Sequence, residues 1–199
     1  MPEPKTLLDM AGVASRPHRL AESAVVMIDA QMEYVNGRLP LTGIEPALEV
    51  GAELLAAARA AGRPVVHVQH QGKGDGLFGP DGPFFAIAPQ VAPLEGEAVV
   101  GKVVPNALAD GVLDTRLNEL GAANIIIAGF MTHLCVSTTA RAALDLGYGC
   151  TVLAPACATR DLPDGQGGVV PAEDLHRVEI AALADRFAMI ATDVGQLTG

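Results

Sequence analysis

Hydrophobic residues in this chain fall into short, nearly unbroken runs. Runs without polar alternation are typical of parallel strands that are covered on both faces. We expect such strands at residues 24–28, 65–69, 97–101, around 125–127, 150–153 and 188–191. Apolar positions with a helical spacing lie between most of these runs, and they predict helices at 44–61, 106–120, 135–146 and 172–187. This alternation of strand and helix predicts an α/β fold with three α/β/α layers and a six-stranded parallel sheet.

Two segments depart from the alternation. Residues 1–22 are polar and contain several prolines, so we expect an N-terminal arm with one helical turn around Thr6–Met10. Residues 71–96 are rich in glycine, proline and aspartate, and they predict a long loop over the strand ends. Its aromatic residues Phe78, Phe84 and Phe85 need burial, which favours an apolar pocket wall over disorder. A length of 199 residues favours a single domain, 1–199.

Composition narrows the function classes. The formal net charge of −10 argues against nucleic acid and anionic membrane surfaces as partners. No apolar run is long enough for a transmembrane helix, and the first residues do not resemble a signal peptide. Three cysteines without a CxxC pair predict a cytoplasmic protein with reduced thiols. Neither a P-loop nor a GxGxxG motif follows any strand, and no metal-ligand spacing occurs, so we expect no cofactor and no metal.

Three reactive side chains fall at the carboxyl ends of different strands. Asp29 ends the first strand, Lys102 follows the third, and Cys135 opens the helix after the fourth. Taken singly, these residues are also typical of a helix cap, a solvated charge and a buried core thiol. Parallel strands end at one edge of a sheet, so the three side chains can converge there.

The chemistry of this set suits acyl transfer to water. A helix N-terminus favours a thiolate at Cys135, Asp29 can accept the thiol proton, and Lys102 can stabilise negative charge. Backbone N–H groups of the turn before Cys135 can hold an oxyanion. The set therefore predicts hydrolysis through a thioester.

Four motifs carry a resemblance to a known family. They are VVMIDAQ at the first strand, VVGK at the third, IIIAGFMTHLCVSTTARAALDLGY around Cys135, and LAPACATRDLP after the fifth. The chain resembles the isochorismatase-like cysteine hydrolases, which include nicotinamidases and N-carbamoylsarcosine amidase. The resemblance runs from Ala24 to about Ile190, and it implies a strand order of 3-2-1-4-5-6. It also implies a homodimer or homotetramer that acts on a small molecule.

The resemblance assigns roles to individual residues. It implies a catalytic triad of Asp29, Lys102 and Cys135, a cis peptide bond between Phe130 and Met131, and an oxyanion hole formed by the N–H groups of Met131 and Cys135. Residues near these positions are expected to shape the substrate pocket. They are Gln31, Tyr34, His70, Phe78, Phe84, Phe85, Leu108, Thr132 and His133.

Departures from the family pattern narrow the activity. The segment HVQHQGKGDG lacks the Asp-x-His cluster of metal-dependent nicotinamidases, and Cys135 is absent from isochorismatases proper, which cleave an enol ether. Leu108 and Pro155 replace residues that are usually Phe and Asp, so the pocket is expected to differ. The sequence thus predicts a metal-independent hydrolase of a C–N bond in a small amide, imide, lactam or ureido compound. An ether hydrolase, a cysteine-based redox protein and a catalytically silent member of the fold remain as alternatives.

Overall fold

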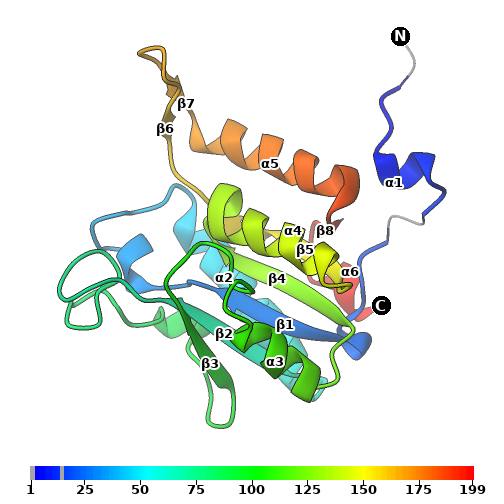
Figure 1. Ribbon diagram of the computed structural model, residues 1–199, viewed down its shortest axis with the longest axis horizontal. Coiled ribbons are helices and arrows are strands. Elements are labelled where there is room, and N and C mark those ends of the chain that lie inside the picture. The colour runs from blue at the N-terminus through cyan, green and yellow to red at the C-terminus, as the bar shows by residue number, and fades with distance from the viewer. Residues whose placement is uncertain (1–2, 14–15) are drawn as a thin grey trace.

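A six-stranded parallel sheet lies between two layers of helices in the computed structural model, which describes residues 3–13 and 16–199 (Figure 1). The strands are β1 Ser23–Ile28, β2 Val65–His70, β3 Ala98–Lys102, β4 Asn124–Phe130, β5 Gly149–Ala158 and β8 Met189–Ala191. They lie in the order β3-β2-β1-β4-β5-β8, and every neighbouring pair is parallel. The predicted fold class and strand order are confirmed, with β8 as the sixth strand of the sheet.

Helices cover both faces of this sheet. They are α1 Leu7–Met10, α2 Ile44–Ala60, α3 Val112–Glu119, α4 Ser137–Asp145, α5 Ala172–Arg186 and α6 Gly195–Thr198. On one face Leu54 and Leu55 of α2 pack with Val25, and on the other Leu117 of α3 packs with Ile127. These side chains are fully buried. Each contributes roughly 1.5–3 kcal/mol through the burial of apolar surface, which explains why the strands carry unbroken apolar runs.

Several element boundaries differ from the sequence prediction. Helix α3 begins at Val112, not at Asn106, because the Asn106 side chain accepts a hydrogen bond from the N–H of Leu108 in a local turn. Gly111 then precedes the helix with φ of 77°. Strand β5 is longer than expected and contains both Cys150 and Cys157, since its second half continues the pairing with β4.

A short hairpin replaces the loop that was expected after the fifth strand. Strands β6 Leu162–Pro163 and β7 Val169–Val170 pair in antiparallel fashion and project beyond the end of α5 (Figure 1). Val178 of α5, which was expected to face inward, is 57% exposed. The apolar stripe of α5 is therefore narrower than its sequence predicts.

The N-terminal arm contains the expected helical turn, α1. Thr6 caps it, since its hydroxyl accepts a hydrogen bond from the N–H of Asp9 at 3.0 Å. The N–H of Leu7 donates to Asp185 at 2.8 Å, which attaches α1 to α5. Other parts of the predicted arm, residues 1–2 and 14–15, lie outside the described residues. None of the described helices has the length and apolarity that crossing a membrane would require.

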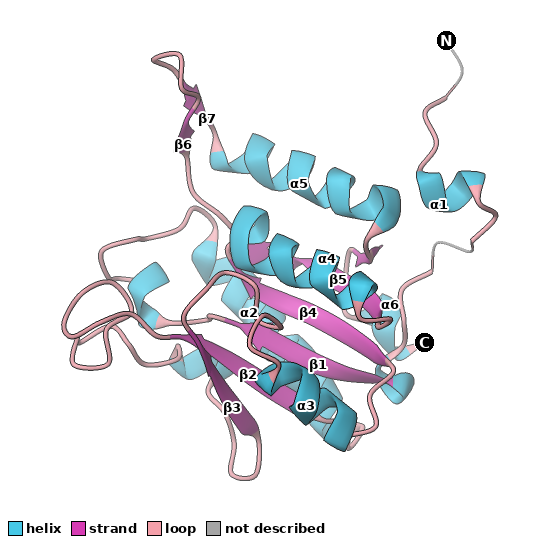
Figure 2. Cartoon of the chain, viewed as in Figure 1, coloured by secondary structure: helices cyan, strands magenta, loops and turns pink. Residues whose placement is uncertain are grey.

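Loops gather at the carboxyl edge of the sheet (Figure 2). The segment 71–96 contains a single 3₁₀ turn, Pro89–Val91, and the chain after β1 contains another, Met32–Tyr34. Ala30 and Gln31 join the first of these loops to the second through the hydrogen bond from Ala88 N to Ala30 O and the bridge between Gln31 and Ile87. This edge is where the chemistry-bearing residues of the sequence were expected to meet.

Candidate active site

Asp29, Lys102 and Cys135 meet at the carboxyl edge of the sheet. The Lys102 ammonium nitrogen lies 2.7 Å from Asp29 Oδ2 and 3.3 Å from Cys135 Sγ. All three side chains are almost fully buried, with exposures of 0% for Asp29, 2% for Lys102 and 3% for Cys135. A base, a cation and a thiol thus share one site that excludes bulk water.

Each of these side chains is positioned by a local feature of its element. Asp29 follows β1 with φ of 49°, a left-handed conformation that Asp tolerates better than bulky residues do. Lys102 is the last residue of β3. Cys135 lies in a π-helical turn, Thr132–Val136, that precedes α4. Such turns are rare and often occur at functional sites.

Glycine at position 129 brings this turn close to Asp29. The sequence predicted that Gly129 ends the strand, but β4 continues to Phe130. Gly129 has φ of 121°, and a Cβ there would overlap the Ile28 carbonyl oxygen. Because glycine permits this contact, β4 can approach the end of β1 directly before Asp29. The next peptide bond, between Phe130 and Met131, is cis.

The thiol of Cys135 is protonated at rest. Burial and the neighbouring Asp29 carboxylate raise its pKa to about 12, and Lys102 only partly opposes them. We had expected the helix N-terminus to favour the thiolate. That expectation is wrong, because burial and a second charge outweigh the effect of the helix. The thiolate must therefore form by proton transfer within the site.

Asp29 has the properties of the base that such a transfer needs. Burial raises its pKa to about 6, while the charge and hydrogen bond of Lys102 lower it. A carboxyl group with a pKa near neutrality can both accept and return a proton. The geometry of the three residues therefore supports a general base next to a nucleophilic thiol.

The turn that carries Cys135 is held from outside by Thr132. Its hydroxyl donates to the carbonyl of Ala158 at 3.1 Å and lies 2.9 Å from Nδ1 of His176 on α5. The sequence predicted that this hydroxyl caps a helix, and it makes no such hydrogen bond. Thr132 is instead fully buried and ties the turn to β5 and α5. Sequence reasoning missed His176, because nothing local marks a helix residue that reaches a distant turn.

The expected pocket residue Gln31 holds the backbone around the site. Its carboxamide exchanges two hydrogen bonds with the backbone of His70, from His70 N at 2.8 Å and to His70 O at 3.1 Å. It also donates to Phe85 O at 2.9 Å. Gln31 is fully buried, and it joins the end of β2 to the loop 71–96.

Aromatic side chains line the next part of the site. The Tyr34 ring packs edge-on against Phe78 and Phe130, with ring centroids 5.0 and 6.0 Å apart. Phe78 also packs against His70 at 5.2 Å. Of the other expected pocket residues, Leu108 is buried, while Phe84, Phe85 and His133 are partly exposed. His133 Nδ1 lies 2.5 Å from the hydroxyl of Thr159.

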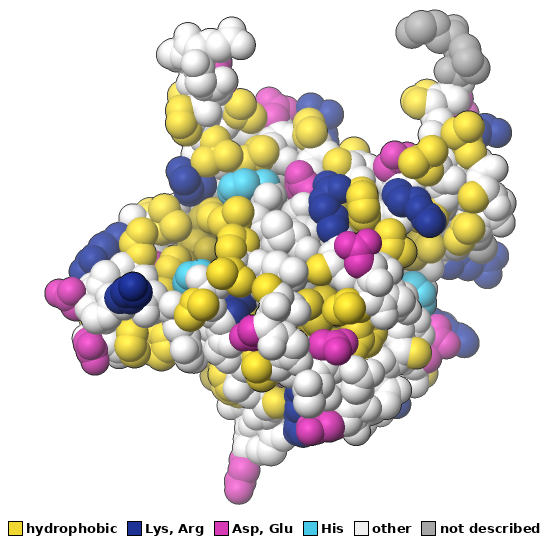
Figure 3. Space-filling view, viewed as in Figure 1, with side chains coloured by type: hydrophobic (Ala, Val, Ile, Leu, Met, Phe, Trp, Pro, Cys, Tyr) yellow, Lys and Arg dark blue, Asp and Glu magenta, His cyan; other side chains and the backbone are white. Residues whose placement is uncertain are grey.

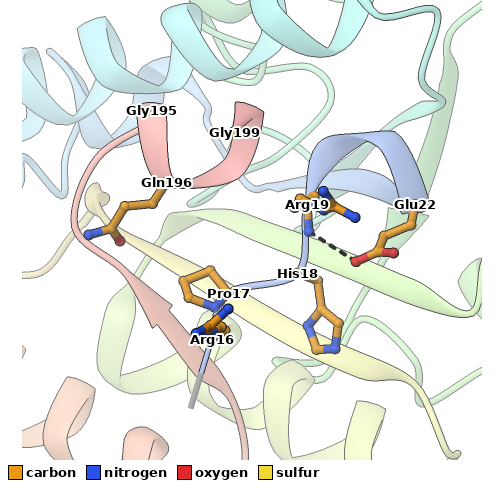
Figure 4. Close-up of a pocket in the computed structure, with 8 residues that line it drawn as sticks. All are labelled: Arg16, Pro17, His18, Arg19, Glu22, Gly195, Gln196 and Gly199. Atoms are coloured by element: carbon orange, nitrogen blue, oxygen red, sulfur yellow. Dashed lines mark hydrogen bonds between the residues drawn. The ribbon is translucent and has the colours of Figure 1, made fainter. Parts of the chain in front are cut away.

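The surface over this edge is apolar in places. Hydrophobic side chains gather there around histidine side chains (Figure 3). A separate cavity of about 650 Å³ lies between the N-terminal segment Arg16–Glu22 and α6, and no triad residue lines it (Figure 4). The described part of the chain has no group of three or more His, Cys, Asp or Glu residues that could hold a metal ion.

Comparison with known proteins identifies the family of this chain. The Isochorismatase domain family matches residues 23–193. The chain belongs to the isochorismatase family. A crystal structure of an isochorismatase from Pseudomonas putida KT2440 is similar, with a TM-score of 0.93 and 44% identity. That alignment covers 98% of this chain and 100% of the other.

Several relatives have named activities. The secreted isochorismatase effector Isc1 of Verticillium dahliae is 37% identical over 92% of this chain and 94% of its own. Streptothricin hydrolase of Streptomyces noursei is 31% identical over 84% and 67%. Ureidoacrylate amidohydrolase RutB of Stutzerimonas stutzeri is 28% identical over 71% and 73%. The family thus consists of hydrolases and includes amidohydrolases.

Proposed function

We propose that this protein hydrolyses a C–N bond of a small amide, imide, lactam or ureido compound through a thioester on Cys135. The observation that carries the proposal is the buried contact of Lys102 with both Asp29 and Cys135. A thiol beside a carboxyl group whose pKa is about 6 matches the pairing of nucleophile and general base. The amidohydrolase among the relatives supports the same reaction class.

The reaction follows in two halves. Asp29 takes the proton from Cys135, and the sulfur attacks the carbonyl carbon. The N–H groups of Met131 and Cys135 hold the resulting oxyanion, and the C–N bond breaks as Asp29 returns the proton to the leaving nitrogen. Asp29 then removes a proton from water, which attacks the thioester and releases the acid and the thiol. Lys102 remains a cation and offsets the negative charge at each stage.

A second candidate is hydrolysis of an enol ether, as in isochorismatases. The relative that favours it is the Verticillium effector at 37% identity. An ether offers no carbonyl carbon for Cys135 to attack, so this reaction would not need the thiol. A redox role is less well supported, because a buried thiol with a pKa of about 12 has little of the thiolate that peroxide oxidises.

A substrate screen tests the proposal. The purified protein is incubated with panels of amides, imides, lactams and ureido compounds, and with isochorismate. Ammonia release and mass spectrometry report hydrolysis, ring opening and larger leaving amines. We expect at least one C–N substrate to be turned over by the wild-type protein and not by Cys135→Ala. Turnover of isochorismate alone, or C–N hydrolysis that survives in Cys135→Ala, would contradict the proposal.

A further inference from the structure

Lys102 has more hydrogen-bond partners than it has protons. Its ammonium lies 2.7 Å from Asp29 Oδ2, 3.0 Å from His70 Nδ1, 3.1 Å from Val104 O and 3.3 Å from Cys135 Sγ. A lysine ammonium carries three N–H donors. Four acceptors therefore compete for three protons, and the sulfur, which is a weak acceptor at the longest distance, competes least well.

His70 takes part in this competition as an acceptor. Lysine has no lone pair to offer, so Nδ1 of His70 must accept the proton and Nε2 must carry the ring N–H. The imidazole is therefore neutral. Burial and the nearby Lys102 charge lower the pKa of His70 to about 4, which is consistent with this state.

The His70 ring is held in place by its surroundings. Gln31 fixes the backbone of His70 through two hydrogen bonds, and the Phe78 ring packs against the imidazole. Phe78 itself has φ of 54°, a left-handed conformation that is costly for a bulky residue. It is held there by Tyr34 and by the hydrogen bond from its N–H to Glu33 at 3.2 Å. The loop 71–96 thus supports the imidazole from the side away from Lys102.

We propose that His70 is a positioning residue that keeps one N–H of Lys102 away from the Cys135 sulfur and thereby sets the reactivity of the thiol. In the resting site, the protons of Lys102 go first to Asp29, His70 and Val104 O. When negative charge develops on sulfur, the N–H held by His70 is the one that can turn toward it, because a neutral acceptor is released more readily than a carboxylate. The inference concerns the same sulfur as the proposed function, but it does not depend on the substrate.

Alkylation of Cys135 tests this competition. The rate of reaction with iodoacetamide is measured from pH 6 to 10, and mass spectrometry of the Cys135 peptide separates it from Cys150 and Cys157. In His70→Leu the competing acceptor is gone while apolar contact with Phe78 remains. We expect alkylation at a given pH to be about threefold to tenfold faster than in the wild type, because the sulfur then receives an unshared N–H.

Two further variants make the test specific. His70→Asn places an amide oxygen near the former position of Nδ1, and we expect its alkylation rate to stay within about twofold of wild type. His18→Leu makes the same chemical change at the opposite edge of the sheet, where His18 bonds Thr151, and it should leave the rate unchanged. A space-filling role for His70 would not separate Leu from Asn. An alkylation rate in His70→Leu at or below wild type, or an equal increase in His70→Asn, would overturn the proposal.

The state of the ring can also be read in the unmodified protein, which removes any dependence on folding of the variants. The other titratable groups near the site, Asp29, Tyr34 and Cys135, are unchanged in that sample. Nitrogen NMR of ¹⁵N-histidine protein should show His70 with a hydrogen-bonded, unprotonated Nδ1 and a protonated Nε2 down to pH 5. A protonated Nδ1 would exclude acceptance from Lys102. Because neither measurement uses a substrate, failure of the substrate screen and failure of this inference are separate results.

Discussion

Lys102 and Asp29 form an ion pair at 2.7 Å that is almost completely shielded from water. Removing two charges from water costs several kcal/mol per ion, and the attraction between them recovers this only with good geometry. Such a pair is weak evidence for stability. Its contact with Cys135 gives it a chemical use, because the same cation that holds the base in place also faces the sulfur.

The thiol of Cys135 is the group whose loss should be most severe. Cys135→Ala removes the nucleophile, and we expect C–N hydrolysis to fall on the order of 10³-fold or more. Cys150 is also buried but has no charged partner, and Cys150→Ala should retain activity. Turnover with the substrate found in the screen measures both. Equal activity in the two variants would show that the sulfur of Cys135 does not take part.

The pKa of Asp29 predicts the acid limb of the rate profile. Asp29 must be ionised to accept the thiol proton, and its pKa is raised to about 6. Activity should therefore be lost as the pH falls through about 6, instead of near the ordinary value of 3.8. The measurement is kcat/KM from pH 4 to 8 with the stability of the protein checked at each pH. A rate that stays constant from pH 7 to 5 would rule out Asp29 as the base.

Lys102→Met tests the cation. Because Lys102 lowers the pKa of Asp29, its removal should move the acid limb above about 6 and reduce the rate at pH 7. The loss of one member of a buried pair should also lower the free energy of unfolding by about 3–5 kcal/mol. Lys73→Met, at an exposed position of the loop 71–96, serves as the control and should change neither value. An unmoved acid limb would show that Lys102 does not act on Asp29.

Thr132 is predicted to stabilise the turn before Cys135. Thr132→Val keeps the shape of the side chain but leaves Ala158 O and His176 without their hydroxyl partner. We expect a loss of about 1–3 kcal/mol in the free energy of unfolding. Thr138→Val removes a hydroxyl that is partly exposed and bonds Leu134 O within the adjoining helical turn, so its cost should be smaller. Urea denaturation of the two variants gives the comparison, and equal costs would argue against a special role for Thr132.

Gly129 and Gly147 separate two costs of adding a side chain. Both have positive φ, but a Cβ at Gly147 meets no atom within 4 Å, whereas one at Gly129 overlaps the Ile28 carbonyl. Gly147→Ala should therefore cost about 1 kcal/mol of backbone strain. Gly129→Ala should cost at least about 3 kcal/mol, because β4 must also move away from β1. Thermal and urea unfolding measure both, and similar stabilities would contradict the close approach of the two strands.

Much of the fold could be predicted because its signals are local. The unbroken apolar run at Ile125–Ile127 indicates a strand that is covered on both faces, and Gly62 marks the end of α2. The failures have the opposite character. Asn106 has the side chain of a helix cap, but Gly111 starts α3, and the hairpin β6/β7 is too short to show alternation.

The sequence by itself determined the alternating elements and the placement of Asp29, Lys102 and Cys135 at strand ends, since hydrophobic period and parallel topology are properties of the chain order. Only the tertiary structure decided how these groups behave. The pKa of Cys135 is raised because packed strands bury it beside Asp29, although its position in the sequence indicated a favoured thiolate. The four acceptors around Lys102 come from four separate segments of the chain. Burial and proximity between distant segments arise only on folding, so local patterns carry no record of them.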